Sequence, residues 1–390
     1  MPIMNKNLVI DKSARISADT NKSNKACGCS PLLQEGNNEL KLYTEGDELY
    51  DAMLNSMSAA SQRIQLESYI FADDEIGRRF MTVLTERSNA GVDVQIHVDA
   101  AGSLFLMSRQ FEQEMLDANI RLQRFHKWNW KSPLRYNRRN HRKLLVVDGR
   151  TAFVGGFNIH RESSKRISGD LRWRDTHIQF ESSLALQAVQ VFDHFWQGDR
   201  HWMPASLPGS SSELLQNYSR RCRRQLRCIF TDMLVNAKQS IYLSTPYFVP
   251  DRHTRNLLTK AARRGIEVCL LVPRKSDVPI ARWASQAIYS ELLKNGVKIF
   301  EYLPRMLHAK TIVVDAVYAT VGTANFDYRS YFVNYELNLF THDIMICKQL
   351  HKQFFVDLES SEEIRLIQWS KRVWMNRLFE MTGWFVRKLL

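Results

Sequence analysis

The spacing of apolar and polar residues predicts helices and strands in alternation, and the same order of elements occurs twice along the chain. In the first half the pattern predicts two helix–strand pairs, over residues 47–61, 63–71, 80–90 and 92–98. In the second half it predicts two more, over residues 229–238, 240–249, 254–264 and 266–272. In each half a glycine suited to a helix C-terminus, Gly91 or Gly265, precedes the second strand. The repeated order predicts two α/β halves with mixed or parallel sheets.

A repeat of only two units favours a pseudo-twofold pair of domains over a solenoid. The composition of the segments outside the repeated elements predicts where the domains begin and end. We expect a flexible N-terminal segment (1–38), a first domain (39–203), a Pro-, Gly- and Ser-rich linker (204–219), a second domain (220–360) and an amphipathic C-terminal tail (361–390).

Each half also contains the same spaced set of polar residues. The first copy reads HRKLLVVDGRTAFVGGFN and supplies His141, Lys143, Asp148, Gly155 and Asn158. The second reads HAKTIVVDAVYATVGTAN and supplies His308, Lys310, Asp315, Gly322 and Asn325 with identical offsets. A lone His-x-Lys is typical of a solvated strand end. Two copies with one spacing, each within a similar half, favour a shared chemical purpose.

The apolar residues inside each copy predict a β-hairpin that brings the polar residues together. His and Lys lie two positions apart and therefore point to one face of a strand. Asp148-Gly149 is a favourable tight turn, whereas Asp315-Ala316 is a weaker one. The returning strand then brings the Asn back toward the His–Lys end. Each half is expected to offer an imidazole, an ammonium and a carboxamide at one point.

Those groups suit a phosphate. Lysine provides charge and asparagine a neutral donor for the nonbridging oxygens. Two such halves facing each other would place histidines on opposite sides of one phosphorus atom, so that one can attack and the other can protonate the leaving alkoxide. Two Lys and two Asn can stabilise the developing charge, so we expect neither a metal nor another cofactor.

The duplicated motif resembles the phospholipase D superfamily, whose mark is HxKxxxxDxxxxxxGxxN in two copies. RNHRKLLVVDG, WRDTH, TVGTANFDYRS and NYELN further resemble bacterial cardiolipin synthases, and the similarity extends over roughly residues 40–360. The resemblance implies two phospholipase D-like α/β halves packed with pseudo-twofold symmetry around one shared active site.

The resemblance also implies residue roles. His141 would be the nucleophile, and His308 the general acid and later the base. The implied phosphate-binding residues are Lys143, Lys310, Asn158 and Asn325. Asp175 of WRDTH and Glu336 of NYELN would orient the histidines through their far ring nitrogens. Asp148 and Asp315 belong to the same catalytic set and are expected to be structural carboxylates near the site.

The chain departs from the usual superfamily pattern in two respects. The small hydroxyl residue that follows the motif glycine is Gly156 in the first copy and Thr323 in the second, and cardiolipin synthases often share the first glycine. Many cardiolipin synthases begin with hydrophobic membrane segments, and no segment here approaches the about 20 apolar residues needed to cross a bilayer. The chain is therefore expected to be of the shorter, peripheral type.

A formal net charge of +13 indicates a polyanionic partner, either nucleic acid, anionic lipid or a phosphorylated metabolite. Basic stretches at 131–143, 220–227 and 369–390 are candidate attachment sites on anionic membranes. In the tail one helical face would carry Trp374, Leu378, Met381, Phe385 and Leu389, flanked by Lys371, Arg377 and Lys388. The alternative is a helix docked on the core.

The leading hypothesis is transfer of a phosphatidyl group to phosphatidylglycerol or a similar acceptor, at the cytoplasmic face of a bacterial inner membrane. Trp128, Trp130 and Trp173 could help to keep water out of such a site. The alternatives are a phosphodiesterase that hydrolyses phospholipid or nucleic acid, and a noncatalytic membrane-binding scaffold. The two motif copies and the tail favour lipid over nucleic acid as the partner, and every catalytic position is filled.

Overall fold

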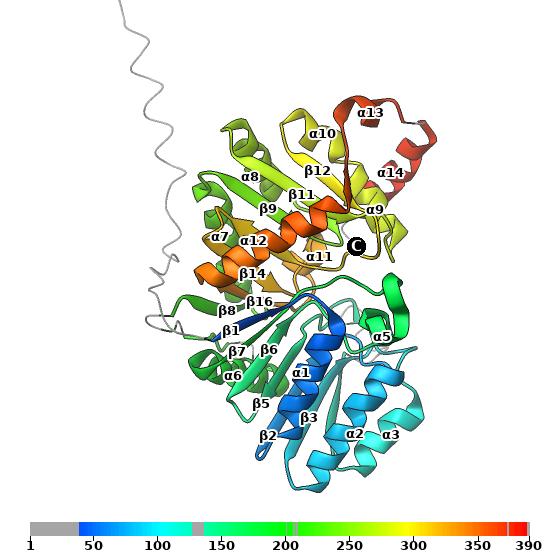
Figure 1. The fold of residues 1–390 in the computed structure, drawn as a ribbon, viewed down its shortest axis with the longest axis vertical. Helices are drawn as coiled ribbons and strands as arrows, with labels where there is room; N and C mark the ends of the chain where they lie inside the picture. Colours follow the sequence, from blue (N-terminus) through cyan, green and yellow to red (C-terminus); the bar gives the residue numbers. More distant parts are fainter. Residues whose placement is uncertain are drawn as a thin grey trace, which may run out of the picture.

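The computed structural model describes residues 39–126, 136–199, 201–205, 207, 210–372 and 374–387. Two large β-sheets, one from each half of the chain, share a central core and are surrounded by helices (Figure 1). The predicted mixed α/β architecture with two similar halves is confirmed.

The first sheet has the strand order β1-β7-β6-β5-β2-β3-β4. Its strands are β1 (Leu40–Tyr43), β2 (Arg63–Ser68), β3 (Asp93–Asp99), β4 (Arg121–Phe125), β5 (Leu144–Val147), β6 (Thr151–Gly155) and β7 (His177–Glu181). The β2, β3 and β4 strands run parallel, and the other neighbouring pairs are antiparallel. The main helices of this half are α1 (Gly46–Ser58), α2 (Glu75–Asn89), α3 (Arg109–Asp117) and α6 (Ser182–Gln197). Short helical turns occur at α5 (Lys165–Ser168), η2 (Arg161–Ser163) and η3 (Gly169–Leu171).

The second sheet has the order β17-β12-β11-β9-β13-β14-β16-β8. Its strands are β8 (Ser212–Gln216), β9 (Ser240–Ser244), β11 (Glu267–Pro273), β12 (Lys298–Tyr302), β13 (Thr311–Val314), β14 (Tyr318–Gly322), β16 (Leu337–Thr341) and β17 (Ser361–Glu363). Six consecutive strands, β16 through β12, match β7 through β4 in order and direction. This match is the pseudo-twofold relation expected from the repeat.

The second half is completed by a separate strand pair and by helices. The strand pair is β10 (Phe248–Val249) with β15 (Phe326–Asp327). The helices are α7 (Arg220–Asn236), α8 (Arg252–Arg263), α9 (Pro279–Gln286), α10 (Tyr289–Lys294), α11 (Tyr328–Phe332), α12 (Ile344–Glu359), α13 (Leu366–Ser370) and α14 (Trp374–Val386).

Two predicted helices begin earlier than the apolar spacing indicates. The α2 helix begins at Glu75 because the side chain of Asp74 accepts hydrogen bonds from the backbone N–H groups of Ile76 and Gly77. The α7 helix begins at Arg220 because the Ser219 hydroxyl accepts from the Cys222 N–H. Both helices begin with a turn that is rich in charged and other polar residues, and the spacing of apolar residues does not detect such a turn.

The expected linker and tail both contribute strands to the second sheet. Within 204–219, β8 pairs with β16 in the same way that β1 pairs with β7, so it is the first strand of the second half. The Pro-, Gly- and Ser-rich composition predicts a linker, but the apolar pair Leu214 and Leu215 that follows the serines lies in a buried strand. At the start of the expected tail, β17 pairs with β12.

The strand that follows each His–Lys pair is buried on both faces, which explains its unbroken apolar sequence. Leu145 and Val147 point into the core of the first half, whereas Leu144 and Val146 point into the central core shared with the second half. The alternation of side chains therefore divides one short strand between two cores.

Both hairpins after these strands make the same turn. Asp148 and Gly149 have φ of 52° and 65°, and Asp315 and Ala316 have 54° and 55°. Left-handed backbone at both central residues is the geometry of a tight hairpin turn, for which Asp-Gly is favourable and an alanine is strained. The weaker turn signal of the second copy thus gives the same structure.

Candidate active site

The two motif copies lie at the junction of the halves, where short parallel bridges join them. Asn140 pairs with Tyr335, and Leu307 pairs with Arg174. His141 and Glu336 each follow the first pair by one residue, and His308 and Asp175 each follow the second. The pseudo-twofold relation therefore places each histidine beside a carboxylate of the opposite half.

The side-chain contacts follow from this arrangement. Nδ1 of His141 lies 3.0 Å from Oε2 of Glu336, and Nδ1 of His308 lies 2.5 Å from Oδ2 of Asp175. A carboxylate at Nδ1 fixes the tautomer that carries its proton there, and leaves Nε2 as the nitrogen available to a substrate. All four side chains are buried.

The two lysines are also buried, beside the histidines. Lys143 Nζ donates to the His141 carbonyl oxygen at 2.8 Å, and Lys310 Nζ donates to the His308 carbonyl oxygen. Lys310 Nζ also lies 2.8 Å from His308 Nδ1. Nδ1 of His308 carries one proton and donates it to Asp175, so it does not also accept a hydrogen bond from Lys310. We therefore take Asp175, whose Oδ2 lies 3.6 Å from Nζ, as the charge partner of Lys310.

Burial and like charge shift the protonation equilibria of the site. Burial, aided by the nearby charge of Lys310, lowers the pKa of Lys143 to about 7. Burial also lowers the pKa of His308 to about 4 and lowers that of His141. Burial opposes ionisation of Asp175, but the charges of Lys310 and His308 outweigh it and hold the pKa of Asp175 below its usual value. Both imidazoles are therefore uncharged at neutral pH.

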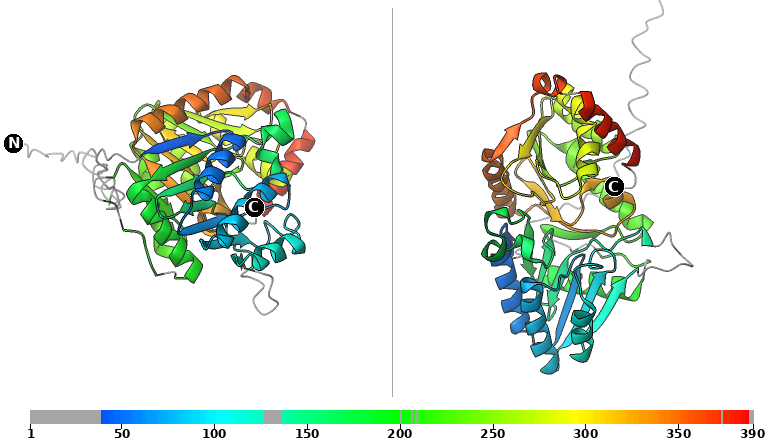
Figure 2. Two further views of the ribbon diagram at one scale, coloured as in Figure 1. Left: turned by 60° about the horizontal axis from the view of Figure 1, so that its bottom comes forward. Right: turned by 90° about the vertical axis from the view of Figure 1, so that its right-hand side faces the viewer.

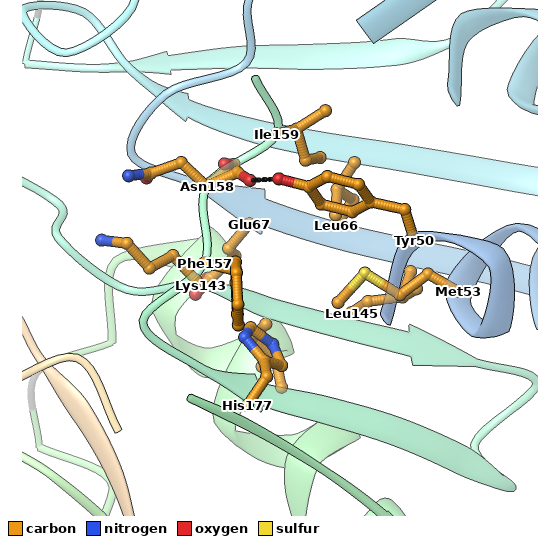
Figure 3. A pocket seen from close by; sticks show the side chains of 12 residues that line it. Tyr50, Met53, Leu66, Glu67, Lys143, Leu145, Phe157, Asn158, Ile159 and His177 are labelled. Carbon is orange, nitrogen blue, oxygen red and sulfur yellow. Dashed lines mark hydrogen bonds between the residues drawn. The ribbon is translucent and has the colours of Figure 1, made fainter. Parts of the chain in front are cut away.

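Asn158 lies at the end of the first hairpin, and hydrogen bonds to its backbone and to its side chain hold it in place. The Tyr50 hydroxyl donates to the Asn158 carbonyl oxygen at 2.6 Å, and Asn158 Oδ1 accepts from the Ile70 N–H at 3.2 Å. In Figure 3 the amide of Asn158 and the ammonium end of Lys143 extend in the same direction, away from Tyr50 and His177. The hairpin therefore brings Lys and Asn together as the sequence predicts.

A cavity of about 450 Å³ opens over Asn158 and the two histidines, and neither Lys143 nor Lys310 is among its lining residues. Residues of both motif copies line it, namely His141, Asn158, His308 and Asn325. The volume lies within the range of small-molecule sites. One cavity with one histidine from each half is the shared site that the pseudo-twofold arrangement predicts.

Asp148 and Asp315 lie away from this cavity, at the far end of the hairpins. Asp148 accepts from the backbone N–H groups of residues 61–63, and Asp315 from those of residues 238–240. A four-residue strand separates each carboxylate from its His–Lys end, about 13 Å at the usual rise. The expectation that they lie near the site is wrong; they anchor the start of β2 and of β9.

Gly156 and Thr323 occupy matching positions beside the two orienting carboxylates. A Cβ on Gly156 would lie 2.0 Å from Oδ1 of Asp175, so no larger residue fits there. The Thr323 hydroxyl instead donates to Oε2 of Glu336 at 2.6 Å. The sequence departure noted above therefore adapts each position to the carboxylate next to it.

Several cavity residues were not assigned from sequence. They are Tyr69, Arg139, Tyr247, Asp277, Asp327, Arg329 and Asn334. Most of them, including Asp327, Arg329 and Asn334, lie inside segments that carry the family resemblance, such as TANFDYRS and NYELN, and that resemblance is the signal that could have identified them. Trp173 lines the cavity as expected, with its ring 5.0 Å from that of His308, while Trp128 and Trp130 lie outside the described residues.

Most basic residues in the described part of the stretch 131–143 do not face a membrane. Arg139, Arg142 and Lys143 are buried, whereas Arg138 is exposed. Arg142 pairs with the buried Glu67 at 2.8 Å and donates to the Val191 carbonyl oxygen, so its charge is satisfied inside the protein. The second stretch, at the start of α7, does expose Arg220, Arg221 and Arg224.

No helix among the described residues is both long and apolar enough to span a bilayer. In the same part of the chain, no group of three or more His, Cys, Asp or Glu side chains is arranged to hold a metal ion.

Comparison with known proteins defines the class. Residues 53–196 and 230–358 match the family described as "Cardiolipin synthase, PLD-like domain". The crystal structure of phosphatidylserine synthase from Haemophilus influenzae superposes with a TM-score of 0.69 at 12% identity, covering 90% of this chain and 95% of that one. The fold is therefore that of the phospholipase D superfamily, with two domains in one chain.

Curated relatives narrow the class to one family. Cardiolipin synthase 2 of Bacillus anthracis is 34% identical over 370 residues, which cover 90% of this chain and 71% of that protein. Cardiolipin synthase of Staphylococcus aureus is 33% identical over 350 residues, covering 86% and 70%. The chain belongs to the PLD-like cardiolipin synthase family, and it is a phosphatidyltransferase of the phospholipase D type.

Proposed function

We propose that this enzyme makes cardiolipin by transferring a phosphatidyl group from one phosphatidylglycerol, through a covalent phosphohistidine, to a hydroxyl of a second phosphatidylglycerol or similar acceptor. The observation that carries the proposal is the pair of histidines from opposite halves, each held by a carboxylate and both lining one cavity with two Asn. Family membership selects the lipid substrates.

In the first step Nε2 of His141 attacks phosphorus, and the bond from phosphorus to the headgroup oxygen breaks. His308 gives its Nε2 proton to that oxygen, so glycerol leaves as a neutral alcohol. Burial lowers the pKa of His308 to about 4, and the negative charge of a bound phosphodiester would raise this pKa and favour the acid form. Asp175 stabilises the imidazolium while it exists.

In the second step His308, now neutral, accepts the proton of the acceptor hydroxyl. The oxygen attacks phosphorus, the bond between phosphorus and Nε2 of His141 breaks, and cardiolipin is released. Lys143, Lys310, Asn158 and Asn325 would hold the nonbridging oxygens throughout. Asp175 and Glu336 would act as positioning residues. Asp148 and Asp315 would have structural roles only, because backbone N–H groups occupy them.

Incubation with phosphatidylglycerol, followed by lipid mass spectrometry, tests the proposal, with plasmid DNA as a parallel substrate. We expect cardiolipin and glycerol to form, and His141→Ala to form neither. Nicking of DNA without any cardiolipin would favour the nucleic-acid phosphodiesterase, and phosphatidic acid alone would favour a phospholipid hydrolase.

We further propose that the protein acts as a peripheral protein at the cytoplasmic face of the cell membrane. Support comes from α14, which lies on the surface of the second half (Figures 1 and 2). Its expected lipid-facing residues are exposed, with Trp374 at 67%, Leu378 at 52%, Met381 at 68% and Phe385 at 87%. Leu389 and Lys388 lie outside the described residues. The flanking Lys371 and Arg377 are exposed and suit anionic headgroups.

The other face of α14 docks on the core, so the docked-helix alternative accounts for that face and leaves the exposed face available to lipid. Phe379 packs against Trp283 with ring centroids 4.9 Å apart, and Gly383 lies close to the backbone of Ala284. Arg372 pairs with the buried Glu380 at 2.6 Å. Because α9 carries Ala281 into the cavity, the exposed face of α14 lies one helix away from the site.

Substitution of Met381 and Phe385 by Glu tests this attachment without uncovering the docked face. We expect affinity for phosphatidylglycerol vesicles to fall about tenfold or more, with little change in activity toward short-chain soluble lipids. Leu186→Glu, at an exposed leucine of α6, is the matched control. Unchanged vesicle binding in the double variant would remove α14 from the attachment surface.

A further inference from the structure

The cavity is chemically unequal at its two ends. On the His141 side it is lined by Arg139 and Arg329, and Tyr69 packs against the imidazole with ring centroids 5.0 Å apart. On the His308 side it is lined by Trp173, Tyr247 and Asp277. Asp277 lines the same cavity as His308, and its negative charge raises the pKa of both His308 and Lys310.

Asp277 and Tyr247 form a fixed pair. The Tyr247 hydroxyl lies 2.7 Å from both Oδ1 and Oδ2 of Asp277 and donates to this carboxylate. The backbone of Tyr247 is held in turn by the Thr245 hydroxyl, which donates to its carbonyl oxygen at 3.0 Å. One phenol occupies only part of the accepting capacity of a carboxylate, which has about four lone-pair sites. Asp277 is accessible to solvent and can therefore accept further hydrogen bonds.

The surroundings of this pair are apolar on the side of the strand pair and α9. Val249, Val278 and Ala281 line the same cavity. An ionised carboxylate makes charge-assisted hydrogen bonds, so Asp277 is a stronger acceptor for a hydroxyl group than a neutral oxygen would be.

The stereochemistry of the reaction determines what occupies this end. In an in-line displacement the leaving and entering oxygens lie on the face of phosphorus opposite the nucleophile. With His141 as nucleophile, that face is the one next to His308. In the proposed function the group there is the glycerol of the donor headgroup in the first step and the glycerol unit of the acceptor in the second.

We propose that Asp277, positioned by Tyr247, binds a free hydroxyl of this glycerol unit and thereby selects polyols over simple alcohols and water. The proposal rests on the proposed function and names the group that the acid–base end recognises. One subsite then serves both steps, because each places glycerol at the same end. The hydrogen bond to Asp277 would hold a neighbouring hydroxyl of the same glycerol toward Nε2 of His308.

The choice between two acceptors tests this directly. The enzyme is supplied with phosphatidylglycerol as donor and with equal concentrations of labelled glycerol and 1-propanol, and the two phosphatidyl products are measured. Both acceptors react with the same phosphohistidine, so their ratio does not depend on how fast that intermediate forms. We expect the wild-type enzyme to favour glycerol, and Asp277→Ala to reduce that preference about tenfold or more, as for loss of a hydrogen bond to a charged group.

Tyr247→Phe keeps the ring and removes the hydroxyl that fixes Asp277, so a shift of about threefold in the same direction is expected. It also provides a second variant should Asp277→Ala fold poorly. Asp117→Ala, at an exposed carboxylate at the end of α3, is the control for loss of charge. A lower total rate with an unchanged glycerol-to-propanol ratio would overturn the proposal and leave Asp277 with a purely electrostatic effect on His308. Absence of cardiolipin from the wild-type reaction would instead contradict the proposed function.

Discussion

The two halves use the same backbone positions to orient their histidines but differ in the groups they place there. His141 is held by Glu336 at 3.0 Å, and the same oxygen of Glu336 also accepts from Thr323. His308 is held by the shorter Asp175 at 2.5 Å, with Lys310 close to both. Duplication therefore fixed the frame of the site, and divergence of a few side chains made its two ends different.

The positions of Gly156 and Thr323 explain how a shorter and a longer carboxylate can do the same task. Backbone N–H groups at both positions donate to matching carbonyls, Gly156 to Thr176 and Thr323 to Leu337. Only the glycine leaves room for Asp175, which lies against it. The comparison indicates that each orienting carboxylate and its neighbour in the sheet act as a unit.

The largest expected effect breaks the equivalence of the two histidines. His141→Ala and His308→Ala should each reduce turnover about 10⁴-fold or more, because one removes the nucleophile and the other the acid–base group. With a phosphatidyl donor that has an acidic leaving group such as p-nitrophenol, His308→Ala should still form the phosphohistidine and accumulate it. Intact-protein mass spectrometry after acid-free quenching would detect the adduct. An adduct in His141→Ala but not in His308→Ala would reverse the roles.

The orienting carboxylates give the next effect. Asp175→Asn and Glu336→Gln keep the shape but favour the wrong histidine tautomer, and a loss in kcat of about 10²- to 10⁴-fold is expected. The loss should be larger for Asp175→Asn, because Lys310 then also lies unpaired in a buried site. Rates of cardiolipin formation, with circular dichroism to confirm folding, measure this. If Glu336→Gln were as fast as the wild type, His141 would not depend on Glu336 in the way that His308 is expected to depend on Asp175.

The duplicated motif was enough to predict the hairpins, the convergence of His, Lys and Asn, and the pairing of two halves. These features depend on local spacing: Leu144 to Val147 is apolar because both of its faces are buried. Asp175 and Glu336 came from resemblance, since no local pattern connects Glu336 with a histidine 195 positions away.

Other features depend on contacts that a single sequence does not display. Asp148 and Asp315 stand at the same offset in the two motif copies, as the catalytic residues do. They nevertheless lie at the far end of each hairpin, because the strand between them and the His–Lys pair runs away from the site. The strand β8 was hidden because its polar flanks resemble a linker, while its pairing partner β16 lies more than a hundred residues later. Arg142 belongs to a basic stretch of the sequence, but its side chain is buried and forms an ion pair with Glu67 inside the protein.

The protonation of Lys143 provides a smaller and graded test of the first half. Its pKa of about 7 means that its charge is present below pH 7 and is lost as the pH rises. If the charged form binds the donor phosphate, KM should rise toward about tenfold per pH unit above pH 8. Bound phosphate restores the charge, so kcat should change at higher pH than kcat/KM does. Lys143→Arg, which stays protonated, should flatten the KM profile; a fall in kcat at constant KM would contradict this role.

The smallest expected effect concerns the pair of neighbours that distinguishes the halves. Thr323→Val removes the hydroxyl that shares Oε2 of Glu336 while keeping the side-chain shape, so Glu336 should remain beside His141 but be held less firmly. Loss of one hydrogen bond at a positioning residue predicts a decrease in kcat of about three- to tenfold with KM nearly unchanged. Thr323→Ser, which retains the hydroxyl, should restore most of the rate. If Thr323→Val is fully active, the carboxylate rather than its neighbour sets the geometry of the first half, and the two halves differ less than their side chains indicate.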